Sequence, residues 1–189
     1  MTASPRERRY RLREQQIIEQ ARQIAESEGW ASVTTRRLAQ EINHSQPVIY
    51  QHFDSRDRIL AAVVTQGFRE LTALIRGAAS ASGDALEQLC WSYLDFGRQN
   101  PALYEAMFTK PTHLRFAHED TPEELRASFE ALTGIIRQET ATTSNNDAAA
   151  LTELFWATCH GLTSLHLAGR IPETHLAAHV QRTCTMIRS

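Results

Sequence analysis

The segment 34–53, TTRRLAQEINHSQPVIYQHF, holds the side chains whose types and spacing best fit recognition of a nucleic acid. Gln46 and Gln51 each offer a paired hydrogen-bond donor and acceptor, which match adenine edges in a major groove. The other outward-facing side chains of the segment fit thymine methyl groups or phosphates: Thr35, Arg36, Arg37, Pro47, Val48, Tyr50 and His52. Outward polar residues are common on short helices, so these residues alone leave open a helix pair without a DNA partner.

Two short helices, over residues 34–42 and 45–53, are needed to position these side chains. Each begins at a threonine or serine able to cap a helix. Asn43 lies between them, and asparagine tolerates the positive φ that a sharp turn requires. The residues that would face a small core are Leu38, Ala39, Ile42, Ile49 and Phe53. This pattern predicts a helix-turn-helix whose second helix enters the major groove.

Basic residues gather at the start of the chain, although the net charge is only −2. Residues 1–60 hold ten arginines against eight acidic residues, and five of these arginines fall in the first 13 residues against Glu7 alone. A segment of this kind can seek DNA phosphates. An exposed, charged start of a helix has the same composition, so both interpretations stay open.

Apolar residues recur at helical spacing along almost the whole chain, and no stretch shows the sustained alternation of a strand. Glycines, prolines and polar residues mark the helix ends. Gly29 should end the first helix, which we expect from about Arg6 to Glu28. The segment 121–124, TPEE, has the spacing of a capping box with proline at the first helical position. We therefore predict an all-α protein of about nine helices.

Residues 10–64 resemble the DNA-binding domain of the TetR family of repressors. The residues that carry the resemblance fall in the order and spacing of that family: Gly29, Thr35, Leu38, Ala39, Ser45, Tyr50, His52, Phe53, Ser55, Arg56 and Leu60. Three positions depart from the usual pattern. Asn43 stands where the family commonly has glycine, His44 where it favours an apolar residue, and Arg56 where it usually has lysine.

The resemblance implies a role for individual side chains. Thr35 and Tyr50 would hold phosphates, and Arg56 would replace a phosphate-binding lysine. The base-facing residues would be Gln46, Pro47 and Val48. With their neighbours, the expected DNA-binding residues are Thr35, Arg36, Arg37, Ser45, Gln46, Pro47, Val48, Tyr50, Gln51, His52 and Arg56.

The resemblance also implies two domains. Residues 1–60 would form a three-helix DNA-binding domain, with the helix-turn-helix at 34–53. Residues 61–189 would form a helical domain for effector binding and dimerisation, and the segment 156–162, WATCHGL, resembles a Trp, His-Gly signature of some family members.

Two C-terminal segments are candidates for a dimer interface. Residues 148–167 are apolar on two faces, and residues 174–187 carry a single apolar stripe. Two such helices from each copy could form a four-helix interface, as the resemblance also implies. The expected interface residues are Leu151, Phe155, Leu162, Leu165, Leu176, Val180, Cys184 and Ile187. The alternative is that both faces pack inside one chain.

Large side chains of the middle helices could line a pocket for a small-molecule effector, because such sites are mostly apolar with few polar groups. The candidates are Trp91, Tyr93, Tyr104, Met107, Phe108 and Phe129, with His160 orienting the ligand. The alternative is an ordinary core, with a buried His160 satisfied by a backbone carbonyl.

Composition also sets limits on the protein's class. No apolar run approaches the ~18 to 20 residues of a membrane span, and the N-terminus is too charged for a signal peptide, so we expect a cytoplasmic protein without a membrane partner. Without a CxxC pair, Cys90, Cys159 and Cys184 should be reduced, buried thiols. His175 and His179 lack a third ligand, so neither a metal nor another cofactor is expected. The P-loop, GxGxxG, GxSxG and HExxH motifs do not occur, so we expect no enzyme.

Together these observations predict a homodimeric transcriptional repressor. It would bind a palindromic operator in double-stranded DNA and would be released by a small-molecule effector. The alternative is a helical small-molecule-binding or interaction protein that has lost operator binding. Salt-dependent DNA affinity distinguishes the two.

Overall fold

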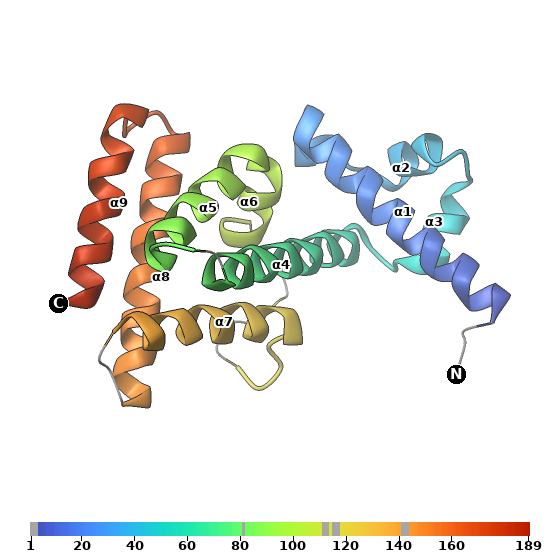
Figure 1. Ribbon diagram of the computed structural model, residues 1–189. Coiled ribbons are helices and arrows are strands. Elements are labelled where there is room, and N and C mark those ends of the chain that lie inside the picture. The colour runs from blue at the N-terminus through green and yellow to red at the C-terminus, as the bar shows by residue number, and fades with distance from the viewer. Residues whose placement is uncertain (1–3, 81, 111–113, 115–117, 141–143) are drawn as a thin grey trace. The chain divides into compact units, whose positions relative to one another are not determined.

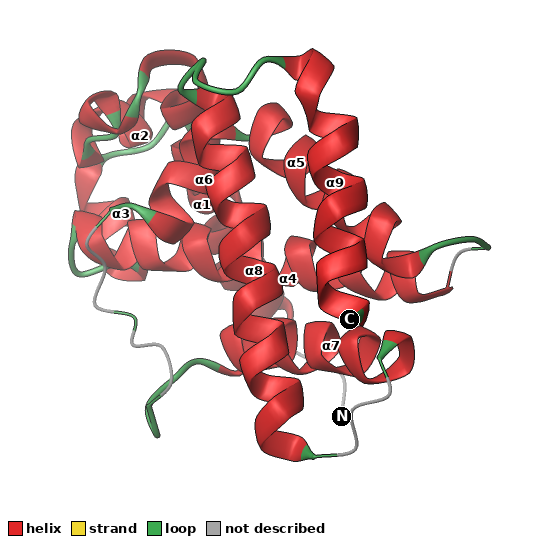
Figure 2. Cartoon of the chain, turned by 90° about the vertical axis from the view of Figure 1, so that its left-hand side faces the viewer, coloured by secondary structure: helices red, strands yellow, loops and turns green. Residues whose placement is uncertain are grey.

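A computed structural model describes residues 4–80, 82–110, 114, 118–140 and 144–189 of the chain (Figure 1). These residues form nine α-helices and one short 3-10 turn, and the described part of the chain contains no strand (Figure 2). The prediction of an all-α protein with about nine helices is therefore confirmed. The elements are α1 (Pro5–Glu28), η1 (Trp30–Ser32), α2 (Thr35–Glu41), α3 (Gln46–His52), α4 (Arg56–Ser80), α5 (Ala85–Gln99), α6 (Pro101–Phe108), α7 (Glu123–Glu139), α8 (Asn145–Leu167) and α9 (Glu173–Arg188).

The ends of α1 show why this helix is well defined. Ser4 Oγ accepts a hydrogen bond from the Glu7 backbone N–H, and the Glu7 carboxylate accepts one from the Ser4 backbone N–H at 2.7 Å. Pro5 occupies the first turn, where its missing N–H has no cost. Gly29 ends the helix with a φ of 83°, as the sequence predicts.

The start of α7 differs from the sequence prediction. The capping box expected at 121–124 does not form, since α7 begins after Pro122 without a side-chain cap. Thr121 Oγ1 instead accepts a hydrogen bond from the His118 backbone N–H at 2.9 Å. The threonine is therefore used by the preceding turn, a local competition that the spacing alone does not reveal.

By packing, the chain divides into two compact units. The first unit comprises Met1–Gly67 with Ala102–Arg115, and the second comprises Phe68–Pro101 with Phe116–Ser189. Helix α4 contributes residues to both units, and nearly all of α6 belongs to the first. The functional boundary predicted between residues 60 and 61 stays a prediction, because packing divides the chain differently.

Helix α6 is held in the first unit by the end of α1. The Glu26 carboxylate accepts hydrogen bonds from the Ala102 and Leu103 backbone N–H groups at 2.9 and 3.0 Å. The Trp30 indole N–H donates to the Ala102 carbonyl at 2.8 Å. A carboxylate at a helix N-terminus satisfies otherwise unpaired N–H groups and favours the helix dipole. Glu26 therefore holds the start of α6 against the end of α1.

The second unit contains α5, α7, α8, α9 and the later part of α4. Helices α8 and α9 lie side by side (Figures 1 and 2). All three cysteines are free and buried in this unit, as expected, and Cys90 Sγ lies 3.3 Å from Cys159 Sγ. The thiol–thiol contact raises the pKa of Cys90, so this thiol stays protonated at neutral pH.

A substitution at Gly67 of α4 tests how tightly α4 and α6 pack in the first unit. A Cβ atom at this position would lie 2.6 Å from Met107 Sδ and 2.9 Å from Leu103 Cδ1, both in buried side chains of α6. We expect Gly67→Ala to lower the free energy of unfolding by about 1–3 kcal/mol in urea unfolding followed by circular dichroism, because overpacking forces the core to shift. Gly77→Ala is the matched control in the same helix, since a Cβ there meets open space. It should be neutral or stabilise by up to about 1 kcal/mol. Equal stability of the two variants would contradict this packing.

Candidate nucleic-acid interface

The turn between α2 and α3 has the sharp geometry that the sequence predicts. Asn43 has a φ of 53°, a left-handed conformation that asparagine tolerates. The Asn43 backbone N–H donates to the Gln40 carbonyl at 3.1 Å, and the His44 N–H donates to the Ala39 carbonyl at 2.8 Å. Leu38 and Ile49 are fully buried under the turn. These bonds and the buried pair fix the angle at which α3 leaves α2.

This turn brings together two hydroxyl groups from different helices. Thr35 Oγ1 at the start of α2 lies 3.5 Å from the Tyr50 hydroxyl on α3. Tyr50 is 51% exposed although it is a large aromatic residue. Two hydroxyls so close together on an exposed surface can both donate to one phosphate group.

Most of the other residues expected to face DNA do point outward from α2 and α3. Val48 is half-buried, and Ser45 does not use its side chain to cap α3. The exposed side chains on this surface are Arg36, Ser45, Gln46, Pro47 and Gln51. Their amide, hydroxyl and guanidinium groups supply donors and acceptors for both base edges and phosphates.

Two arginines expected to contact DNA form contacts within the chain. Arg37 pairs with Glu28 and with Glu41, each at 2.8 Å, and hydrogen bonding to Glu41, then to Glu28, raises its pKa. Arg56 donates from its guanidinium to the backbone carbonyl of Trp30. Arg37 thus ties α2 to the end of α1, and Arg56 ties the start of α4 to η1. Sequence reasoning did not anticipate this structural role of either arginine.

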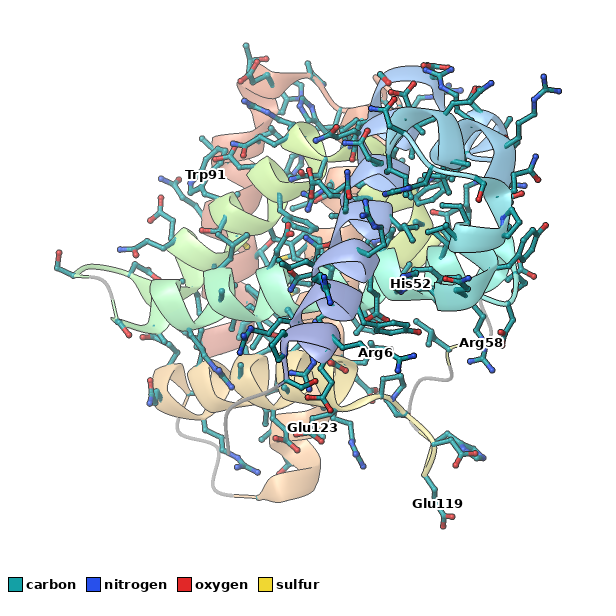
Figure 3. The ribbon with its side chains drawn as sticks, turned by 90° about the vertical axis from the view of Figure 1, so that its right-hand side faces the viewer. Arg6, His52, Arg58, Trp91, Glu119 and Glu123 are labelled. Atoms are coloured by element: carbon teal, nitrogen blue, oxygen red, sulfur yellow. The ribbon has the colours of Figure 1, made fainter. Side chains whose placement is uncertain are left out.

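His52 also differs from its expected outward direction. Its ring is half-buried on the side of α3 that faces α1 and packs on Tyr10, with the two ring centroids 4.1 Å apart (Figure 3). The Tyr10 hydroxyl donates to the Gln51 carbonyl at 3.1 Å. Sequence reasoning missed Tyr10, and the available signal was its helical alignment with the core residues Ile17 and Ala21.

The environment of His52 predicts a pH dependence for the first unit. Burial lowers the pKa of His52 below 6.5, with Arg13 acting in the same direction and Glu14 opposing it. Its Nδ1 atom is buried without a hydrogen-bond partner in the described structure. Because the unfolded chain binds this proton more readily, stability should fall as the pH drops below about 6.5 and level off beneath the lowered folded pKa.

The control for this effect is His52→Phe, which keeps a ring on Tyr10 but cannot take up a proton. Melting temperatures measured from pH 7.5 to 5 should decline more steeply for the wild-type protein than for the variant. Parallel declines would show that His52 does not contribute.

The expected effector residues are divided between the two units. Tyr104, Met107 and Phe108 lie on α6 in the first unit. The second unit contains Trp91, Tyr93, Phe129 and His160. In that unit the Trp156 indole N–H donates to the Tyr93 hydroxyl at 3.1 Å, and burial lowers the pKa of His160.

The expected dimer residues differ in their burial within the chain. Five of them are at most 4% exposed and pack in the core of their own chain: Phe155, Leu176, Val180, Cys184 and Ile187. The apolar stripe of α9 thus packs inside its own chain, which is the alternative that the sequence left open for these residues. Leu151 and Leu162 are half-buried, while Leu165 is 47% exposed.

The described residues were also compared with the requirements of a metal site and of a membrane-spanning helix. The rings of His175 and His179 lie 6.4 Å apart, and within the described ranges no three His, Cys, Asp or Glu side chains form a group able to hold a metal ion. None of the helices that the structure describes combines the length and apolarity needed to cross a membrane.

The surface formed by α2 and α3 is that of a helix-turn-helix DNA-binding protein, and comparison with known families agrees. The model of the bacterial regulatory proteins of the tetR family matches residues 17–63. The model of the tetracyclin repressor-like C-terminal domain matches residues 86–187, more than half of the chain. The chain belongs to the TetR family and is a DNA-binding transcription regulator.

Individual relatives and solved structures share only a modest part of their sequence with this chain. The uncharacterized HTH-type transcriptional regulator Rv0681 of Mycobacterium tuberculosis is 26% identical over 162 residues, covering 84% of this chain and 72% of the relative. The crystal structure of the regulatory protein SCO4313 superposes with a TM-score of 0.77 at 20% identity, covering 97% of this chain and 98% of the other. A TetR variant from Acinetobacter baumannii AYE in complex with minocycline gives a TM-score of 0.64 at 17% identity, with 90% and 92% coverage. These structures share the fold.

Proposed function

We propose that this regulator is a repressor that places α3 of each subunit in the major groove of a palindromic operator. The observation that carries the proposal is the Thr35–Tyr50 hydroxyl pair beside the exposed start of α3. The pair would hold a phosphate at the groove edge, which sets the register of α3 on the duplex. Gln46 and Pro47, exposed at the N-terminal end of α3, would then face base edges, as recognition helices do.

Substitutions within α3 test this placement. Gln46→Ala should weaken binding to the preferred sequence by about 1–3 kcal/mol and relax the preference at one base position. Tyr50→Phe removes only the hydroxyl, so it should weaken binding to all sequences alike. Fluorescence anisotropy with selected and scrambled duplexes measures both effects. The control Gln138→Ala changes an exposed glutamine of α7 and should have no effect. Wild-type affinity in both α3 variants would place the reading surface elsewhere.

A homodimer is the proposed assembly, because two recognition helices about 34–36 Å apart are needed to read two half-sites. The proposed interface is the outer face of α8, where Leu154, Ala157, Gly161 and Leu165 recur at helical spacing. A Cβ on Gly161 would meet open space, so the glycine lets another helix approach closely. Exposed Met186 supplies apolar surface on α9.

Introduced charge tests this interface. Leu154→Glu or Leu165→Glu should raise the dimer dissociation constant by about a hundredfold, because an unpaired carboxylate would be buried between the subunits. Sedimentation velocity over a range of concentrations measures the change. Leu74→Glu, at a leucine of α4 that is 39% exposed, is the control. Dimers of undiminished stability in both α8 variants would exclude this face.

The proposed effector is a small organic molecule bound in the second unit. The TetR variant in complex with minocycline is a structural neighbour that holds such a ligand. In this chain, Tyr93, Trp156 and His160 provide polar groups among apolar side chains of α5 and α8. An effector releases the operator only if it binds the DNA-free state more tightly than the DNA-bound state. The cytoplasm is the proposed location, since the operator lies there.

A further inference from the structure

Helix α1 extends well beyond the core that it helps to form. Its first buried residue is Ile17, and the residues from Pro5 to Gln16 are all exposed or half-buried. We call this segment, residues 5–16, the arginine arm. It precedes residues 17–63, which match the family's DNA-binding model, so the family match does not account for it.

Tyr10 attaches the arm to the C-terminal end of the recognition helix α3. Tyr10 donates its hydroxyl hydrogen to the Gln51 carbonyl and packs its ring on His52. The capping box at Ser4 and Glu7 keeps the helix intact beyond this attachment. Thus the arm has a defined position relative to α3, although it has no buried residue of its own.

The net charge on the arm is positive. It carries five arginines against Glu7 and Glu14. Arg6, Arg9 and Arg13 recur at i, i+3 and i+7, along one edge of the helix beside Tyr10. Arg6 and Arg9 are exposed and pair with no carboxylate within the described ranges.

A neighbouring helix adds to this charge. Arg58 at the start of α4 is also exposed. Arg13 is close enough to lower the pKa of His52 on α3. The arm therefore brings positive charge to the C-terminal end of the recognition helix.

We propose that the arginine arm binds phosphates of duplex DNA flanking the half-site, with Tyr10 as the positioning residue. The inference rests on the proposed operator binding by α3. The arm contacts the C-terminal end of α3 through Tyr10, so a duplex that receives α3 would lie close to the arm. Guanidinium groups bind phosphates bidentately, and such contacts add affinity without reading sequence.

The test is the salt dependence of binding to two duplexes, one ending at the half-sites and one extended by several base pairs on each side. The double variant Arg6→Ala/Arg9→Ala should reduce the slope of log K against log salt by about 1 for each arginine, on the extended duplex only. Sequence preference should not change. Arg76→Ala, at an exposed arginine of the second unit, is the control and should leave the slope at its wild-type value.

Variants of Tyr10 show whether this residue positions the arm on α3 or only stabilises the folded domain. Tyr10→Ala should reproduce the loss of slope, because it removes both the hydrogen bond and the ring contact with α3. Tyr10→Phe keeps the ring on His52 and should restore most of the slope. Equal urea midpoints for these variants and the wild type would show that the folded core is intact.

The outcomes distinguish the arm from the proposed function. If Gln46→Ala weakens DNA binding while the double arginine variant keeps the wild-type slope, the arm proposal is overturned and the operator proposal survives. If the wild-type protein shows no salt-dependent DNA binding, both fail. Binding of the arm to anionic phosphatidylserine vesicles, with unchanged DNA affinity in the double variant, would also overturn the proposal.

Discussion

The positive φ of Asn43 is the constraint on which the rest of the interface depends. It turns the chain sharply enough for Leu38 and Ile49 to be buried together, and the same turn brings Thr35 within 3.5 Å of Tyr50. A residue with a branched Cβ would resist this conformation. The position of every exposed α3 side chain therefore follows from one backbone angle and one buried pair. Tyr10 then holds the far end of α3 through Gln51 and His52.

Ion pairs and carboxylate caps stabilise the frame around this surface. Arg37 joins α2 to α1 through Glu28, and Glu26 caps α6 from the same helix. Since α6 and part of α4 belong to the first unit, the chain enters and leaves that unit more than once. The polypeptide backbone would thus connect an effector site in the second unit to the DNA-binding helices at more than one point. Coupling still requires a difference in affinity between two states.

Local signals made much of this fold predictable. Helical periodicity, the glycine stop at Gly29 and the turn at Asn43 depend on neighbouring residues, and the structure confirms them. Arg37 and Arg56 were expected to face DNA because composition cannot show that Glu28 or the Trp30 carbonyl lies within reach. The stripe of α9 was expected at a dimer interface, but it packs inside its own chain. An apolar face of one helix has the same pattern whether a partner chain or the same chain covers it.

Operator recognition by a dimer through α3 can be tested on genomic DNA. The most direct measurement is selection of genomic fragments by the purified wild-type protein at two salt concentrations, followed by sequencing. We expect enrichment of one palindrome whose half-site centres lie about 10 base pairs, or a multiple of that, apart, with affinity that falls steeply as salt rises. Fragments bound without a shared sequence, or no enrichment at low salt, would contradict it.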